Sequence, residues 1–289
     1  MKRLRIVLVA LAVSLSAPFT GSPTAQAHSG YQPQRNVVTY VALGDSYSAG
    51  VGNGKYDEKS GTCMRSAKAY PKLLARYDRL KLDFKACSGA TTDSLIDDQL
   101  PAAPDGDVEE VTVTIGGTDI GTFTLLPDCL GLDGVPGCSE IGKGKFSGAI
   151  NDVLPGKMSN ALNSIHATYP HATVYVGGYM QLFGDRKEAC TVGQLNSQSF
   201  SVNYADKVWL NKMARKLNAT IKKAVRDARA TMPAKYVDVA HVFDGHGLCD
   251  SRRPWFFTLD ATNLEGLLHP TARGQLAYAV AFHHAGVGS

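Results

Sequence analysis

Apolar residues in this chain form short continuous runs that alternate with longer stretches of helical spacing. Continuous apolar runs of about four to eight residues are typical of strands that are buried on both faces of a sheet. Runs of this kind lie at 37–43, 82–87, 111–115, 172–178 and 234–243.

Between these runs, apolar residues recur every three or four positions, which is the spacing of an amphipathic helix. Helices are therefore predicted at 68–80, 145–169, 203–232 and 270–286. Alternating strands and helices predict an α/β fold, with a mostly parallel central sheet covered by helices on both faces. No internal repeat or low-complexity tail interrupts the pattern, and 289 residues fit one generous domain.

The first 27 residues have the three parts of a secretory signal peptide. MKRLR is a basic start, IVLVALAVSL is an apolar core and TAQA is a small-residue cleavage site. The apolar core is too short to span a membrane as a helix. We therefore expect a signal peptide at 1–27, a mature domain at 28–289 and a secreted, extracellular protein.

Composition and charge narrow the class of protein further. Hydrophobic residues make up 44% and charged residues 19% of the chain, which is typical of a globular protein. The formal net charge is +4, but segment 1–27 holds three basic residues and no acid, so the mature chain carries only +1. This weak balance does not indicate a nucleic-acid partner.

Six cysteines follow the predicted signal peptide, and an even number in an exported chain indicates three disulfides. Sequence alone permits fifteen pairings of six cysteines. Cys129 and Cys138, which flank a segment rich in glycine and proline, most simply pair with each other. No two cysteines have C-x-x-C spacing and none lies near a histidine in a zinc pattern, so structural disulfides are favoured over a metal site.

Polar motifs follow several of the predicted strands, where ligands bind in parallel sheets. GDSYS, ACSGATT and TIGGTD lie in such places. Ser46 in GDSYS is a candidate nucleophile, which requires a base to take its proton and donors to stabilise an oxyanion. Ser48 stands where the G-x-S-x-G elbow has glycine, which disfavours an ordinary α/β-hydrolase.

The base is sought among eight histidines. His269 is the strongest candidate, because Pro270 directly after it predicts a rigid helix start that would hold the ring. His241 and His246, after the last predicted strand, remain alternatives. Asp45 and Asp119 each follow a strand, and we expect structural roles in which their carboxylates bind backbone N–H groups of the turn.

Taken together, these motifs resemble the sequence blocks of the SGNH (GDSL-type) hydrolases. GDSYSAG, the glycine of ACSGATT, TIGGTD and a late His-Pro occur in the order of that family's four blocks. The chain is most similar to the secreted lipases, esterases and phospholipases of actinomycetes, which share a segment like VGGYMQLFG and six paired cysteines. The resemblance runs from about Asn36 to the C-terminus.

This resemblance implies a three-layer α/β/α SGNH-hydrolase fold and a Ser-His mechanism on carboxylic esters, with no cofactor. By position, Ser46 would be the nucleophile and His269 the general base. The backbone N–H groups of Ser46 and Gly89 would contribute to the oxyanion hole. The resemblance also implies sequential disulfides, Cys63–Cys87, Cys129–Cys138 and Cys190–Cys249.

Two positions depart from the family pattern. Thr118 replaces an asparagine whose side-chain amide donates to the oxyanion, and loss of one such donor costs about 10²–10³ in rate. Gly266 replaces the aspartate that often orients the histidine. A main-chain carbonyl of Gly266 or Leu267 would then hold the imidazole, with the carboxylate of Glu265 as the less favoured alternative.

The function predicted from the sequence is that of a secreted serine esterase or lipase acting on lipid or medium-chain acyl esters. A phospholipase A and an acyl-carbohydrate esterase are alternatives within this class. The alternative is a degenerate SGNH protein that binds lipid or glycan without significant turnover, as the replacements at Thr118 and Gly266 indicate. The apolar segment 121–132 is interpreted as a loop that either meets an acyl chain or packs against the body of the domain, and 178–201 as a surface loop held by a disulfide of Cys190. The expected partners are an ester substrate and, transiently, a lipid surface; the protein is expected to be a monomer.

Overall fold

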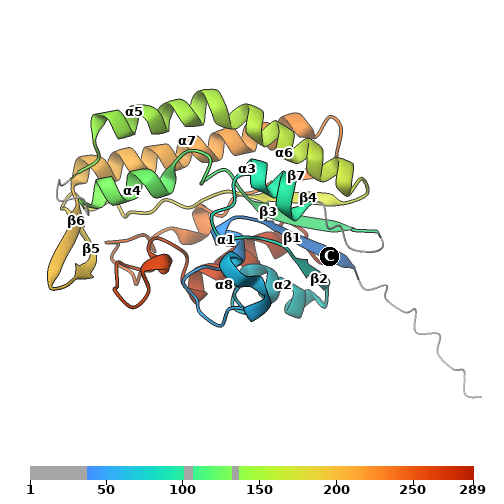
Figure 1. Cartoon of the computed structure of the whole chain (residues 1–289), viewed down its shortest axis with the longest axis horizontal. Helices are drawn as coiled ribbons and strands as arrows, with labels where there is room; N and C mark the ends of the chain where they lie inside the picture. Colours follow the sequence, from blue (N-terminus) through green and yellow to red (C-terminus); the bar gives the residue numbers. More distant parts are fainter. Residues whose placement is uncertain (1–37, 101–106, 132–136) are drawn as a thin grey trace, which may run out of the picture. The chain divides into compact units, whose positions relative to one another are not determined.

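The predicted strands pair into a parallel sheet that forms the centre of the fold (Figure 1). The computed structural model describes residues 38–100, 107–131 and 137–289. Five strands lie in the order β2-β1-β3-β4-β7, and all neighbouring strands are parallel. Their bounds are β1 Thr39–Gly44, β2 Lys81–Phe84, β3 Glu110–Thr114, β4 Thr173–Gly177 and β7 Ala234–Val237. This order reverses beside β1, so a crevice is expected at the carboxyl ends of β1 and β3.

Helices cover both faces of this sheet and confirm the predicted α/β/α layers (Figure 1). Helices α2 (Tyr70–Asp78) and α8 (Ala272–His284) pack together on one face. The other face carries α3 (Thr92–Ser94), α5 (Glu140–Gly148), α6 (Leu154–Thr168) and α7 (Tyr204–Ala228). Helix α7 begins at the Asn203 cap, whose side chain accepts a hydrogen bond from the Asp206 N–H.

Helix α4 (Thr122–Leu130) occupies the apolar segment that was predicted to be a loop, so the loop assignment is wrong. Gly121 and Gly131 adopt left-handed conformations at its two ends, which marks where the helix starts and stops. Leu125, Leu126 and Leu130 are buried on one side of the helix. Burial of this apolar stripe stabilises a helix that turn residues alone would not predict.

The predicted loop at 178–201 contains a β-hairpin, which corrects the second loop prediction. Strands β5 (Cys190–Leu195) and β6 (Gln198–Val202) are antiparallel and form a separate two-stranded sheet. Asn196 and Ser197 between them both have positive φ, as a tight hairpin turn requires. The Cys190–Cys249 disulfide ties this hairpin to the loop after β7.

Three disulfides are present, and they join cysteines in the sequential order that the family resemblance implies: Cys63–Cys87, Cys129–Cys138 and Cys190–Cys249. The remaining elements are short: α1 (Ser46–Ala49), 3₁₀ turns at Glu58–Cys63, His241–Phe243 and Leu264–Gly266, and π-helical turns at Leu95–Gln99 and Ala149–Val153. The described residues form a single unit. The predicted signal peptide at 1–27 lies outside the described residues.

Candidate active site

Ser46 lies at the carboxyl end of β1, on the first residue of α1. Gly44 ends the strand with φ +121°, and a Cβ there would lie 2.3 Å from the Thr114 carbonyl oxygen, so only glycine fits this close approach to β3. The Asp45 N–H donates to the same carbonyl over 2.9 Å. The turn between β1 and α1 is thereby fixed to β3, and Ser46 is held with only 2% of its surface exposed.

His269 meets Ser46 across 223 positions of sequence. The distance between His269 Nε2 and Ser46 Oγ is 2.8 Å, and His269 Nδ1 lies 3.1 Å from the Leu267 carbonyl oxygen. A carbonyl only accepts, so Nδ1 carries the proton and Nε2 is left to accept from the serine hydroxyl. The Gly266 carbonyl, the other candidate, also accepts from the His269 backbone N–H over 2.9 Å.

The loop around His269 is held by pairing with a neighbouring segment rather than by a helix start. Phe257 exchanges two hydrogen bonds with this loop, donating to the His269 carbonyl over 2.9 Å and accepting from the Leu268 N–H over 3.0 Å. Leu268 has φ +60°, a left-handed conformation that is costly for a residue with a Cβ. The cap of α8 is Thr271, so the prediction that Pro270 lies in its first turn is wrong.

Burial lowers the pKa of His269 to about 4, and the backbone carbonyls of Leu267, Gly266 and Glu265 offset only part of this effect. The imidazole is therefore neutral at pH 7, as a general base must be before it takes a proton. The effect of Glu265 on the pKa of His269 comes from its backbone carbonyl. His241 is exposed at the far side of α7, beside Arg215 and Lys222, and does not line the pocket at Ser46.

Gly89 lies on a turn that the structure anchors near the nucleophile. The Cys63–Cys87 disulfide ties the start of this turn to the segment that ends at Cys63, and the Cys87 N–H donates to the Gly44 carbonyl over 2.9 Å. Gly89 has φ +74°, and a Cβ at this position would meet no atom within 4 Å. The space above its backbone is therefore open, as it must be for a reacting group to approach.

Thr118 lies on the turn after β3 and lines the same pocket as Ser46. Its Oγ1 is buried and has no hydrogen-bond partner among the described residues. A buried hydroxyl without a partner is unfavourable by about 1–3 kcal/mol unless something else bonds to it. The neighbouring Asp119 has a structural role, as expected, because its carboxylate accepts from the N–H and hydroxyl of Thr92.

Asp45 is buried beside Ser46 and accepts hydrogen bonds from several elements. Its Oδ1 accepts from the Tyr47 N–H over 3.0 Å and from Thr114 Oγ1 over 2.8 Å, while Oδ2 accepts from the hydroxyl of Tyr179. Desolvation nevertheless raises the pKa of the Asp45 carboxyl to about 6, against the lowering effect of these donors. The expected turn-holding role is therefore confirmed for its backbone bonds, whereas the contact with Tyr179 was not predicted.

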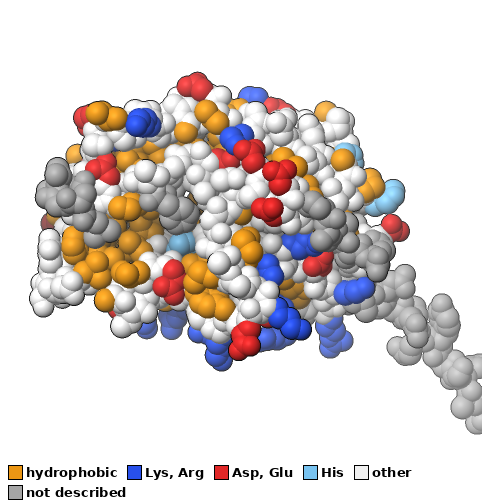
Figure 2. Space-filling model, in the orientation of Figure 1, with side chains coloured by type: hydrophobic (Ala, Val, Ile, Leu, Met, Phe, Trp, Pro, Cys, Tyr) orange, Lys and Arg blue, Asp and Glu red, His pale blue; other side chains and the backbone are white. Residues whose placement is uncertain are grey.

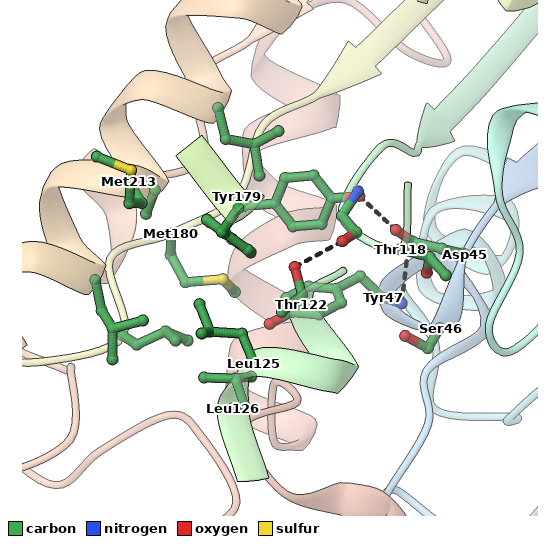
Figure 3. Close-up of a pocket in the computed structure, with 16 residues that line it drawn as sticks. Asp45, Ser46, Tyr47, Thr118, Thr122, Leu125, Leu126, Tyr179, Met180 and Met213 are labelled. Atoms are coloured by element: carbon green, nitrogen blue, oxygen red, sulfur yellow. Dashed lines mark hydrogen bonds between the residues drawn. The ribbon is translucent and has the colours of Figure 1, made fainter. Parts of the chain in front are cut away.

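An apolar pocket extends away from Ser46 (Figure 3). Ser46 and Thr118 lie at one end, and Leu125, Met180 and Met213 lie progressively further from them. The space open to the centres of water-sized molecules is about 70 Å³, which is several times what one water needs. The remaining apolar lining comes from α4, α5, α7 and the segment after β4: Leu126, Phe146, Leu182, Leu210, Ala214 and Leu217.

Helical spacing alone favours the protein core as the partner of the apolar positions of α7. Leu210, Met213 and Leu217 are indeed buried, but they also line this pocket. Helical spacing shows which face of a helix is covered, not whether protein or ligand covers it. The pocket could not be found from the sequence, because its lining comes from three helices far apart in the chain and only the tertiary structure brings them together.

The three α/β/α layers place a serine at the carboxyl end of a parallel sheet, where it is hydrogen-bonded to a histidine. Together with the absence of the G-x-S-x-G elbow, this arrangement defines an SGNH-type hydrolase architecture. The chain belongs to the GDSL-like lipase/acylhydrolase family, whose sequence model matches residues 42–277.

Several proteins of the genus Streptomyces are similar to this chain over most of its length. Lipase 1 of Streptomyces coelicolor is 34% identical over 279 residues, which cover 95% of this chain and 96% of the relative. The crystal structure of phospholipase A1 from Streptomyces albidoflavus NA297 matches with a TM-score of 0.74 and 31% identity, over 86% of this chain and 99% of that one. The extracellular lipase of Streptomyces rimosus matches with the same TM-score and 33% identity, over 86% of this chain and all of its own.

Proposed function

We propose that this protein hydrolyses carboxylic esters through Ser46 and His269. The observation that carries the proposal is the 2.8 Å contact between Ser46 Oγ and His269 Nε2, in a ring whose other nitrogen donates to Leu267. Ser46 Oγ attacks the ester carbonyl carbon while Nε2 takes its proton, and the imidazolium then protonates the leaving alkoxide. Water, activated by the same ring, next attacks the acyl-serine and releases the acid.

The oxyanion of the tetrahedral intermediate is assigned to the backbone N–H groups of Ser46 and Gly89. The first N–H groups of a helix have no partner within the helix, so that of Ser46 is available. The hydroxyl of Thr118 is the candidate third donor, since it is buried in the pocket and unpartnered within the described part of the chain. Its reach is shorter than that of an asparagine amide, so we expect turnover that is slow by the standards of the family.

The preferred substrates are esters of medium or longer acyl chains. The pocket beside Ser46 is lined mostly by apolar side chains, and such a lining binds an acyl chain by removing it from water. The relatives named as lipases and as a phospholipase A1 support the same substrate class. We therefore assign the acyl part of the substrate to the pocket between α4, α5 and α7.

Transient contact with a lipid surface is proposed at a second apolar groove, which lies beside the His269 loop. Its apolar lining is Leu195 and Phe200 of the hairpin and Leu259, Leu264 and Leu267 of the last loop, with Asn196 and Gln198 as polar neighbours. Leu264 is 53% exposed. Figure 2 shows hydrophobic side chains gathered on this part of the face. A monomer is proposed, with 1–27 as a signal peptide, 28–289 as the mature domain and the extracellular space as its location.

Two observations support export. The Streptomyces rimosus relative is an extracellular lipase, and the part of the chain that the structure describes contains three disulfides, which persist in oxidising environments. No helix among the described residues is long and apolar enough to cross a membrane. N-terminal sequencing of protein recovered from the culture medium tests the cleavage site before His28.

Hydrolysis of p-nitrophenyl esters of increasing acyl length tests the proposed function. Mature protein should release p-nitrophenol and should be labelled by a fluorophosphonate, and Ser46→Ala should abolish both. Labelling that persists in Ser46→Ala would show that another residue is the nucleophile. Undiminished hydrolysis in His269→Ala would remove His269 as the base. A binding protein without turnover is disfavoured, because binding alone has no need of the Ser46–His269 contact.

A further inference from the structure

One phenol connects the nucleophile turn to the turn that carries Thr118. Tyr179 lies just after β4, and its hydroxyl donates to Asp45 Oδ2 (Figure 3). The same oxygen accepts from the Gly117 N–H over 3.2 Å. Asp45 caps the helix that begins at Ser46, and Gly117 precedes Thr118, so a single oxygen atom bonds to both walls of the site.

Tyr179 is itself fixed on its other side by α7. The Asn218 side chain accepts from the Tyr179 N–H over 2.7 Å and donates to the Tyr179 carbonyl. The Tyr179 ring also packs edge-on against Tyr47, with 5.2 Å between ring centroids. A side chain held at the backbone and at the ring has little freedom to move its hydroxyl, which is what a rigid spacer between two turns requires.

We propose that Tyr179 is a positioning residue, whose hydroxyl sets the distance between the Ser46 turn and the Gly117–Thr118 turn and so shapes the oxyanion site. The inference rests on the proposed function of Ser46. Tyr179 acts through Asp45 and Gly117 and does not itself donate to the oxyanion. Because a misplacement of about 1 Å costs roughly 10²-fold in rate, a spacer of this kind affects turnover more than substrate binding.

The geometry depends on the ionised form of Asp45, which accepts from all of its partners. Titratable groups face this carboxylate from four elements: Tyr47 on α1, Tyr70 on α2, Tyr179 after β4 and Tyr278 on α8. Burial raises the pKa of each of these phenols, so they stay neutral over the pH range in which activity is measured. Protonation of Asp45 is therefore the event that breaks the bond pattern, since a protonated oxygen must donate.

The test is Tyr179→Phe, which removes the hydroxyl and keeps the ring. With p-nitrophenyl butyrate as substrate, we expect kcat to fall about 10- to 100-fold and KM to stay within about twofold. The acid limb of the pH–kcat profile should also move. In the wild type it should lie near 6, the pKa of Asp45. Loss of one hydrogen bond to the carboxylate should shift it upward by about one pH unit.

Tyr278→Phe is the matched control. Tyr278 is as deeply buried, and its hydroxyl donates to the carbonyl of Gly178, one residue before Tyr179, but it does not bond to Asp45. A purely structural effect would appear in both variants, whereas a positioning effect would lower kcat and shift the acid limb only in Tyr179→Phe. Equal kcat values and unshifted acid limbs in the two variants would overturn the inference.

Fluorophosphonate labelling separates this inference from the proposed function. Wild-type protein that is not labelled at Ser46 would refute the proposed function itself, whereas labelled wild type with an unaltered Tyr179→Phe variant would refute only the role of Tyr179. If Tyr179→Phe does not fold, Asp45→Asn decides the question. That variant should turn over slowly and lose the acid limb near pH 6, and an unchanged limb would overturn the inference.

Discussion

Asp45 should cost the protein stability at neutral pH, and this cost can be measured. The carboxyl is 2% exposed, and burial raises its pKa from an ordinary 3.8 to about 6. A raised carboxyl pKa means that the folded state favours the protonated form, so the stability it contributes is present below pH 3.8 and is lost as pH rises through 6. At about 1.36 kcal/mol per pH unit, the full loss is about 3 kcal/mol.

Asp45→Asn removes this pH dependence while keeping the shape of the side chain. The free energy of unfolding of the variant minus that of the wild type should therefore rise by about 2 kcal/mol between pH 4 and pH 8. The difference in Tm between the variant and the wild type should accordingly be about 5 °C larger at pH 8 than at pH 4. The constant offset depends on how the amide reorients among the donors of Tyr47, Thr114 and Tyr179, so the change with pH is the quantity to test.

The assay is urea unfolding of mature protein with its disulfides intact, followed by circular dichroism at several pH values. Asp119→Asn is the control, because its side chain is equally buried but is paired with Lys157 at 3.6 Å. That variant should be less stable than the wild type at pH 7, since it leaves the lysine and Thr92 with a weaker acceptor. A difference between Asp45→Asn and wild type that stays constant within about 0.5 kcal/mol from pH 4 to pH 8 would refute the reasoning.

The other predictions concern rate, specificity and the disulfides. Thr118→Asn should raise kcat about 10- to 100-fold by supplying a longer oxyanion donor, and an unchanged kcat in folded protein would contradict this assignment. Ala214→Leu should fill the pocket and lower kcat/KM about fourfold for each methylene that it excludes, as measured across an acyl-length series. Ala219→Leu, on the exposed side of α7, should leave the series unchanged. Removing Cys190–Cys249 should cost about 4 kcal/mol and removing Cys129–Cys138 about 3, because the loops close over 59 and 9 positions. Equal losses in urea unfolding would contradict the loop-length argument.

The sequence by itself was sufficient for the family and the layer architecture, and it selected Ser46 and His269 as candidates, which the structure brings within 2.8 Å of each other. Apolar runs and helical spacing are local properties of the chain. They predicted four strands of the parallel sheet to within three residues, whereas β7 ends six residues before the predicted end at 243. The order of GDS, the later glycine motifs and His-Pro pointed to Ser46 and His269, because the chemistry requires those residue types. Comparison with the same family motifs also showed that Thr118 and Gly266 replace the residues usual at these positions.

Tertiary structure alone decided how these residues are supported. The sequence of helix α4 is as compatible with a loop as with a helix. The helix forms because Leu125 and Leu126 pack into the core of the folded protein. That Leu267 rather than Glu265 orients the imidazole follows from the path of a loop paired with Phe257. The pocket joins side chains of three helices, and the Tyr179 hydroxyl meets Asp45 across 134 positions of sequence. Such contacts depend on how distant segments pack together, and no local pattern of residues records that.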